Sequence, residues 1–209
     1  MTINPSQPEP SHANISTPVL TPTTNKPCTI PHTFRIGCPS DSLIISELLR
    51  EVFTQTFSFD LTQEDLDDYL NTTLTNEQIK SDIEDPNSIW ILALSSASGK
   101  EEEEELLGII QLKFNSFKDC LTLNENPIEL HRIYLSTKTH GKGLSQSILS
   151  YTQNLAISKG YKSIWLGVYS KHPQGIKFYE KSGFVKCGER IFVVGEDKQV
   201  DWVMEKPLI

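Results

Sequence analysis

One stretch, residues 129–158, constrains the fold of this chain more than any other. It reads ELHRIYL, then STKTHGKGLS, then QSILSYTQNLAIS. The first part is rich in β-branched and aromatic residues, which is typical of a strand, and the last part repeats apolar residues every three or four positions, which predicts a helix with one buried stripe. A strand, a glycine turn and a helix in this order present backbone N–H groups and a positive dipole end to an anion.

The glycine turn is the first candidate binding site. Gly141 and Gly143 allow the backbone to approach an anion closely, and Lys138 and Lys142 add positive charge beside it. The turn matches neither the Walker pattern nor the GxGxxG dinucleotide pattern. We interpret it as a site for a phosphate-bearing cofactor. A turn without any ligand is the alternative interpretation, because such turns commonly join strands to helices.

Length and composition limit the class of protein. The chain has 209 residues, 37% of them apolar, and a formal net charge of −8, which suits one domain with an appendage. Its four cysteines are scattered without a CxxC pair, which favours neither a zinc site nor a disulfide framework. We therefore expect a cytoplasmic protein, with the nucleus as a second location. We also expect no metal, nucleic-acid or membrane partner, and either a monomer or a homodimer.

Residues 1–32 differ in composition from the rest of the chain. Seven of the twelve prolines lie there among Thr, Ser and Asn residues, and Glu9 and Lys26 carry the only formal charges. Such a segment buries too little apolar surface to offset the entropy of its ordering. We expect a disordered Pro/Thr/Ser-rich tail over 1–32, either idle or carrying a regulatory site, and one folded domain over 33–209.

Periodicity and turn residues predict strands and helices along the folded domain. Strands are expected at 33–36, 88–94, 106–114, 129–135, 162–169, 184–194 and 200–204, and helices at 41–53, 62–70, 76–83, 144–158 and 173–181. The helix over 144–158 connects two strands across the sheet, which predicts a mixed sheet with one parallel pair.

A second segment, residues 165–184, reads WLGVYSKHPQGIKFYEKSGF. Together with ELHRIYLSTKTHGKGLS it resembles the GNAT superfamily of acetyl-CoA-dependent N-acetyltransferases. The cofactor loop of that family has the form [Q/R]xxGx[G/A]. This chain has HGKGLS at 140–145, so His140 replaces Gln or Arg and Ser145 replaces Gly or Ala.

The downstream family motif has the form NxxAxxFYxxxGF. Here His172 stands for Asn and Gly175 for Ala, while FY at 178–179 and GF at 183–184 match. The two motifs in this order and spacing are far more specific than either alone.

The resemblance implies an α/β, mixed α+β, GNAT fold. This is a central, mostly antiparallel sheet of about seven strands with one splayed parallel pair, flanked by helices. It also implies transfer of acetyl from acetyl-CoA, a co-substrate, to a primary amine by direct attack in a ternary complex. The residues implied to bind the cofactor are Ile133, Tyr134, Leu135, His140, Gly141, Lys142, Gly143, Leu144, Ser145, His172, Tyr179 and Lys181.

Acetyl transfer to an amine needs a base, a proton donor and hydrogen-bond donors for the oxyanion. The resemblance makes Tyr179 the candidate acid for the departing thiolate, with aromatic packing as its alternative role. Glu129 is the candidate base because some family members carry a catalytic glutamate at this position. Strand alternation places His131, the second candidate base, on the same face as Glu129. Backbone N–H groups over 133–135 are candidate oxyanion donors, and a base that acts through water stays open.

Within the superfamily, several details resemble the bacterial polyamine (spermidine/spermine) N-acetyltransferases. They are RIYL at 132–135, WLGVY at 165–169, FVVG at 192–195, Asp201, Met204 and a helical insert over 57–85. Acidic residues outnumber basic ones by 17 to 3 over residues 41–105, whereas basic residues prevail by 14 to 9 over 106–209. The acidic part is expected to form the acceptor side, where Glu47, Glu51, Glu64 and Asp68 would attract a cationic amine. The alternatives are acetylation of a protein N-terminus or lysine, and a catalytically idle module that binds acyl-CoA.

Overall fold

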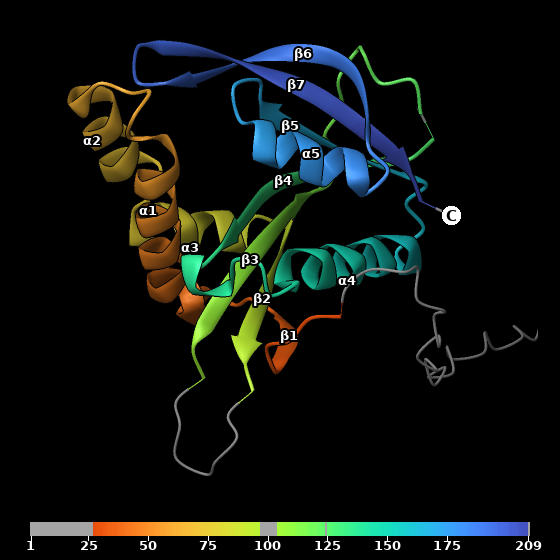
Figure 1. Ribbon diagram of the computed structural model, residues 1–209, viewed down its shortest axis with the longest axis horizontal. Coiled ribbons are helices and arrows are strands. Elements are labelled where there is room, and N and C mark those ends of the chain that lie inside the picture. Colours follow the sequence, from red (N-terminus) through yellow and green to blue (C-terminus); the bar gives the residue numbers. More distant parts are fainter. Residues whose placement is uncertain (1–26, 97–103, 124, 209) are drawn as a thin grey trace, which may run out of the picture.

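The computed structural model describes residues 27–96, 104–123 and 125–208 (Figure 1). Most of the expected tail, residues 1–26, and most of the charged loop, residues 97–103, lie outside the described residues. Seven strands form one sheet in the order β1-β2-β3-β4-β5-β7-β6. Their bounds are β1 His32–Ile36, β2 Ser88–Ser95, β3 Leu106–Lys113, β4 Pro127–Leu135, β5 Ser163–Tyr169, β6 Val185–Val194 and β7 Asp197–Pro207.

Every neighbouring pair of strands is antiparallel except β4 and β5, which are parallel. Between those two strands the chain forms helix α4, so the predicted crossover and the predicted mixed sheet are confirmed. The five α-helices are α1 Ser42–Phe57, α2 Gln63–Thr72, α3 Asn76–Glu84, α4 Leu144–Ser158 and α5 Pro173–Lys181.

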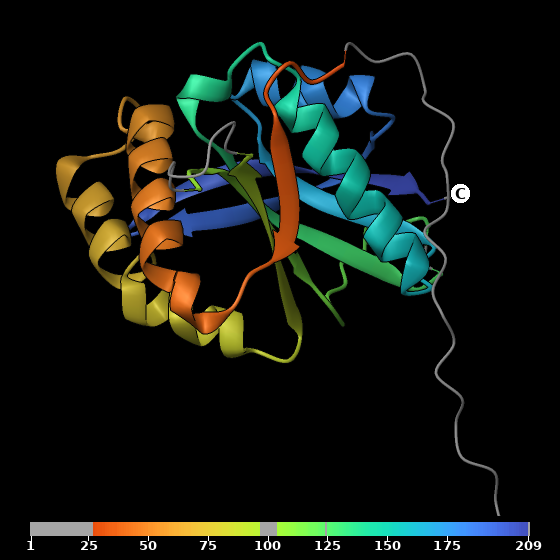
Figure 2. The same cartoon turned by 90° about the horizontal axis from the view of Figure 1, so that it is seen from below.

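The helices cover both faces of the sheet, with α1, α2 and α3 on one side and α4 and α5 on the other (Figures 1 and 2). Strand β2 shows why both faces are apolar. Ile91 and Ala93 point into the core under α4 and α5, whereas Trp90, Leu92 and Leu94 point into the core under α1 to α3. A central strand buried on both faces reads as a continuous apolar run, and SIWILALS is such a run.

Local sequence signals set the helix ends. The Thr62 side chain accepts a hydrogen bond from the N–H of Asp65 at 3.1 Å and so caps α2, as its position predicts. Gly160 follows α4 in the left-handed conformation, with φ of +85°, and confirms the expected stop after this helix.

The segment before β1 contacts the start of α4. The backbone N–H of Thr29 donates to the carbonyl of Lys142 at 2.9 Å, and the His32 ring lies 2.8 Å from the Ser147 hydroxyl. Residues 27–31, which composition alone assigns to the tail, therefore lie against the folded domain. Within the described part of the chain, no helix combines the length and the apolar character needed to cross a membrane.

Candidate active site

A cavity of about 1130 Å³ lies where β4 and β5 separate. The two strands pair only from Pro127 to Glu129 on β4, against 163–165 on β5. Beyond this point no strand among the described residues pairs with the edge of β4 that faces β5, and Ile133 and Tyr134 of β4 and Gly167 of β5 line the cavity. The predicted splayed pair thus forms the centre of the site.

A β-bulge at His131 starts this separation. Gln111 of β3 pairs with Arg132 and Leu112 pairs with Leu130, so His131 is the extra residue on β4. A bulge bends the strand and changes the direction of its side chains. The side chains of Glu129 and His131 still share one face, as the expected alternation predicts, because Nδ1 of His131 lies 3.1 Å from the Glu129 carboxylate. Of the two, only His131 lines the cavity.

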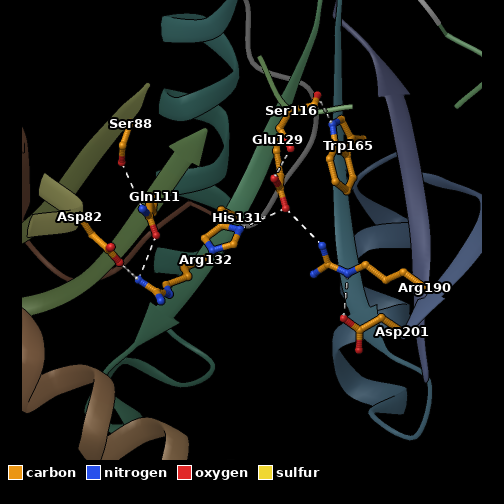
Figure 3. Close-up of polar contacts among 10 residues, drawn as sticks. All are labelled: Asp82, Ser88, Gln111, Ser116, Glu129, His131, Arg132, Trp165, Arg190 and Asp201. Carbon is orange, nitrogen blue, oxygen red and sulfur yellow. Dashed lines mark hydrogen bonds and ion pairs between the residues drawn. The ribbon is translucent and has the colours of Figure 1, made fainter. Parts of the chain in front are cut away.

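The Glu129 carboxylate is the centre of a buried network (Figure 3). It accepts hydrogen bonds from the Ser116 hydroxyl at 2.6 Å, from Nδ1 of His131 at 3.1 Å and from Arg190 at 3.3 Å. Arg190 also donates to Asp201 at 3.2 Å. The carboxylate is 5% exposed, so it is fixed in place by groups from the loop after β3, from β4 and from β6.

The same contacts set the charges of this pair. Burial alone would raise the pKa of Glu129, but the hydrogen bond and the charge of His131, the hydrogen bond from Ser116 and the charge of Arg190 lower that pKa to about 2. Burial lowers the pKa of His131 below its ordinary value, against the opposite effect of Glu129. At neutral pH the carboxylate is therefore ionised and the imidazole is neutral.

The position of Arg190 depends on a glycine. A Cβ atom added to Gly167 would lie 2.4 Å from a terminal nitrogen of Arg190 and 2.5 Å from Cζ of the guanidinium. The guanidinium therefore lies directly over the backbone of β5, in space that only glycine leaves free. This explains why WLGVY carries a glycine in the middle of a buried strand.

A second network holds β4 beyond the bulge. Arg132 donates to Asp82 of α3 at 2.9 Å and to Gln111 of β3 at 3.1 Å, and Gln111 donates to Ser88 of β2 at 3.1 Å (Figure 3). The Arg132 guanidinium also lies 5.7 Å from the centre of the Trp90 ring. These contacts connect α3 to the strand that carries His131.

Tyr179 of α5 lines the cavity from the other side and is 6% exposed. Its ring packs edge-on against Phe178 at 5.2 Å and Phe184 at 5.6 Å. Burial raises the pKa of the Tyr179 hydroxyl, so this group keeps its proton at neutral pH.

The glycine turn and the N-terminus of α4 form one end of the cavity. Gly141 lines the cavity and has a φ of +72°. A Cβ added to Gly141 would meet no other described atom within 4 Å, so the space beside this backbone is open. Gly143 has a φ of +86° and packs against Cys28, whose Cα lies 3.1 Å from the corresponding position. The first turn of α4 leaves N–H groups without intrahelical acceptors, which is the geometry that binds anions.

Comparison with known proteins identifies the family. Residues 46–184 match the model of the Acetyltransferase (GNAT) family, which is more than half of the chain. The chain belongs to this family. It is thus an N-acetyltransferase of the GNAT type that uses acetyl-CoA as co-substrate, and the fold and enzyme class that its two motifs imply are confirmed.

Relatives and solved structures agree with this GNAT assignment. An uncharacterized N-acetyltransferase in the pepI 3′ region of Lactobacillus delbrueckii subsp. lactis is 25% identical over 160 residues, which are 77% of this chain and 88% of the relative. The PaiA N-acetyltransferase from Thermoplasma acidophilum in complex with coenzyme A has a TM-score of 0.63 at 21% identity, over 85% of this chain and 99% of that one. The spermidine N-acetyltransferase from Vibrio cholerae in complex with CoA and spermine has a TM-score of 0.59 at 18% identity, over 85% and 95%. At these identities the two structures show the shared fold.

Most residues that the GNAT motifs single out meet at the cavity, and some do not. The lining includes Ile133, Tyr134, Leu135, His140, Gly141, Ser145, His172 and Tyr179. Lys142, Gly143, Leu144 and Lys181 lie outside it, and Leu144 is a core residue that is 1% exposed. Within the described residues, no group of three or more His, Cys, Asp or Glu side chains is arranged to hold a metal ion.

The four carboxylates expected at the acceptor side of this GNAT domain do not line the cavity. Glu47, Glu51, Glu64 and Asp68 are all exposed on the outer surfaces of α1 and α2. The inner surface of these helices is aromatic instead, with Phe53, Phe57 and Tyr69 in the lining. Arg190 of β6 and Gln199 of β7 also line the cavity, and neither was singled out from the sequence. Their only signal is the two-residue alternation that places them on the face of the hairpin toward the cavity.

Proposed function

We propose that this GNAT enzyme transfers acetyl from acetyl-CoA to the primary amine of a small molecule by direct attack in a ternary complex. One observation carries the proposal: a single cavity is lined by the glycine turn, by Tyr179 and by the neutral ring of His131. A phosphate site, an acid and a base thus share one cavity, and these are the groups that a CoA thioester and an amine would need.

His131 is the proposed general base, in place of the Glu129 expected from the sequence. The ionised Glu129 accepts the Nδ1–H of His131, so the lone pair of the ring lies on Nε2. A neutral imidazole with a free Nε2 can take the amine proton directly or through one water. Glu129 itself has a pKa of about 2 and does not reach the cavity, so it is a weak base and serves as a positioning residue.

Tyr179 is the proposed acid for the departing thiolate. It is protonated, it lines the cavity, and its ring is held by Phe178 and Phe184. The amides of β4 on the edge toward β5, over residues 133–135, are the proposed oxyanion donors because no strand pairs with that edge. Both roles rest on residues that face the same cavity.

The proposed pyrophosphate site is formed by the glycine turn and the first N–H groups of α4. Open space beside Gly141 supports this proposal, since a phosphate can approach the backbone there. His140, Ser145 and His172 would contact the same cofactor from the lining. Lys142 and Lys181 remain candidates for long-range attraction of the phosphates, as both are charged but lie outside the lining.

Two acceptor classes are compatible with this chemistry. A polyamine acceptor has the support of the fold that the chain shares with the Vibrio cholerae enzyme whose structure holds spermine. A protein N-terminus or lysine is the second class, and the idle acyl-CoA-binding module is the alternative without turnover.

Thiol release and product mass test the proposal. Purified protein is incubated with acetyl-CoA and a panel of amines and peptides, and free CoA thiol is measured together with the mass of the acceptor. We expect amine-dependent thiol release and a matching N-acetylated small amine. Acetyl-CoA binding without amine-dependent thiol release would support the idle module, and acetylation of peptides alone would support the second class.

A further inference from the structure

Aromatic side chains form one connected part of the cavity wall. Phe53 of α1 stacks on Tyr69 of α2 with ring centres 4.4 Å apart, and Tyr69 meets Phe192 of β6 at 6.4 Å. All three line the cavity. An acceptor whose amine lies at His131 can therefore place its body against these aromatic rings, which favour apolar and aromatic groups.

The charged groups of the lining are already paired. Asp201 is the only carboxylate among the described lining residues, and it accepts a hydrogen bond from Arg190 at 3.2 Å. Arg132 pairs with Asp82, and Lys171 pairs with Asp60. A second ammonium group of a polyamine would find no unpaired carboxylate in the described part of the wall, and an unpaired buried charge is costly.

One polar group of the wall lacks a partner. Gln199 lines the cavity, is 6% exposed, and its buried Nε2 has no hydrogen-bond partner among the described residues. Gln199 pairs with Phe192 and Asp201 pairs with Arg190, so all four face the cavity from the β6–β7 hairpin. Gln199 lies two residues from Asp201, about 7 Å along the strand. A buried donor without a partner costs free energy that a ligand oxygen would recover.

From these three observations we infer that the acceptor carries one primary amine, an aromatic-sized apolar body, and an oxygen at its far end that accepts a hydrogen bond from Gln199. The inference rests on the proposed function and narrows its acceptor. The amine lies at His131, the body lies against Phe53, Tyr69 and Phe192, and the far oxygen lies at Gln199.

A comparison of three amines tests this inference. The specificity constant kcat/KM is measured by thiol release for tyramine, phenethylamine and spermidine at saturating acetyl-CoA. We expect the highest kcat/KM for tyramine and the next highest for phenethylamine. The kcat/KM for spermidine should be at least about tenfold below that for tyramine. Preference for spermidine overturns the inference and leaves the proposed function intact. No thiol release with any amine, by protein that binds acetyl-CoA, refutes the proposed function itself.

Two glutamine variants isolate the role of Gln199. Gln199→Leu should lower kcat/KM for tyramine about three- to tenfold, which is the range expected for one neutral hydrogen bond. The same variant should change kcat/KM for phenethylamine less than about twofold. Both kcat/KM values are measured on the same variant. Partial unfolding would lower both equally, so it cannot change the ratio between them. Gln153 of α4 is the matched control, because its buried Nε2 also lacks a partner among the described residues but lies outside the lining. Gln153→Leu should leave the ratio unchanged, and an equal effect of Gln199→Leu on both amines overturns the assignment.

Discussion

Replacing Glu129 by glutamine keeps the size of the side chain but removes the charge at the centre of the network in Figure 3. Three donors hold the carboxylate: Ser116 at 2.6 Å, His131 at 3.1 Å and Arg190 at 3.3 Å. They lower its pKa from the ordinary value of 4.5 to about 2. At 1.36 kcal/mol for each pKa unit, the ionised carboxylate contributes about 3 kcal/mol to the free energy of unfolding.

The sign of the pH dependence follows from the direction of this change. Because the pKa of Glu129 is lower in the folded chain, its contribution is complete above about pH 4.5 and is lost as the pH falls toward 2. Between about pH 5 and pH 3 the free energy of unfolding of the wild-type chain should fall by about 2 kcal/mol because of Glu129. In Glu129→Gln this contribution to the fall should be absent. Urea unfolding at the two pH values measures it.

The same variant should lose turnover. Without an ionised acceptor, Nδ1–H is no longer the favoured tautomer of His131, and kcat should fall by about 10²-fold or more while the affinity for acetyl-CoA stays the same. Glu205→Gln is the matched control, because Glu205 is also 5% exposed but bonds to Thr122 and Leu123 away from the cavity. Wild-type kcat in a folded Glu129→Gln variant would refute the claim that Glu129 positions the base.

Three further changes test other parts of the site. Tyr179→Phe should lower kcat about 10²-fold with unchanged acetyl-CoA affinity by calorimetry, and wild-type turnover would reduce Tyr179 to a packing role. Gly167→Ala should displace Arg190 from the β5 backbone and lower both the melting temperature and kcat, whereas an unchanged melting temperature would show that the guanidinium has room to move. Removing residues 1–26 should leave the melting temperature unchanged, while removing 1–31 should lower it by ~2–8 °C because Thr29 and Cys28 contact the start of α4. Equal melting temperatures for both truncations would show that this contact adds nothing to stability.

The sequence predicts the elements well because their signals are local. Thr62 caps α2 and Gly160 ends α4. The helix that connects strands 129–135 and 163–169 makes them a parallel pair. Each of these three signals is read from neighbouring residues in the sequence. The glycine turn and Tyr179 are found for the same reason, since each lies in a short motif whose spacing fixes its place.

The choice between Glu129 and His131 depends on distant residues. His131, which lines the cavity, is also the extra residue of a bulge that exists only in the register of β4 against β3. The pKa of Glu129 depends on burial and on the nearby His131, but also on Ser116, thirteen residues earlier, and on Arg190, sixty-one residues later. No local pattern in ELHRIYL carries this information, so the sequence leaves both bases open.

The acceptor side shows a different limit of sequence reasoning. The acidic charge of residues 41–105 is a property of the chain, but Glu47, Glu51, Glu64 and Asp68 lie on exposed helix surfaces. The amphipathic pattern of these helices places the opposite, apolar face toward the sheet. Net charge therefore indicates how a cationic ligand is attracted from a distance, and not which side chains it touches.

The tautomer and pKa of His131 test the catalytic assignment most directly. In ¹⁵N-labelled protein at pH 7, histidine NMR distinguishes protonated from unprotonated ring nitrogens, and His131→Asn identifies the signal. The account predicts a neutral ring with the proton on Nδ1 and a pKa below the ordinary 6.5, because burial lowers it and Glu129 accepts the Nδ1–H. A ring that is protonated at pH 7, or neutral with its proton on Nε2, would contradict the assignment of His131 as the base.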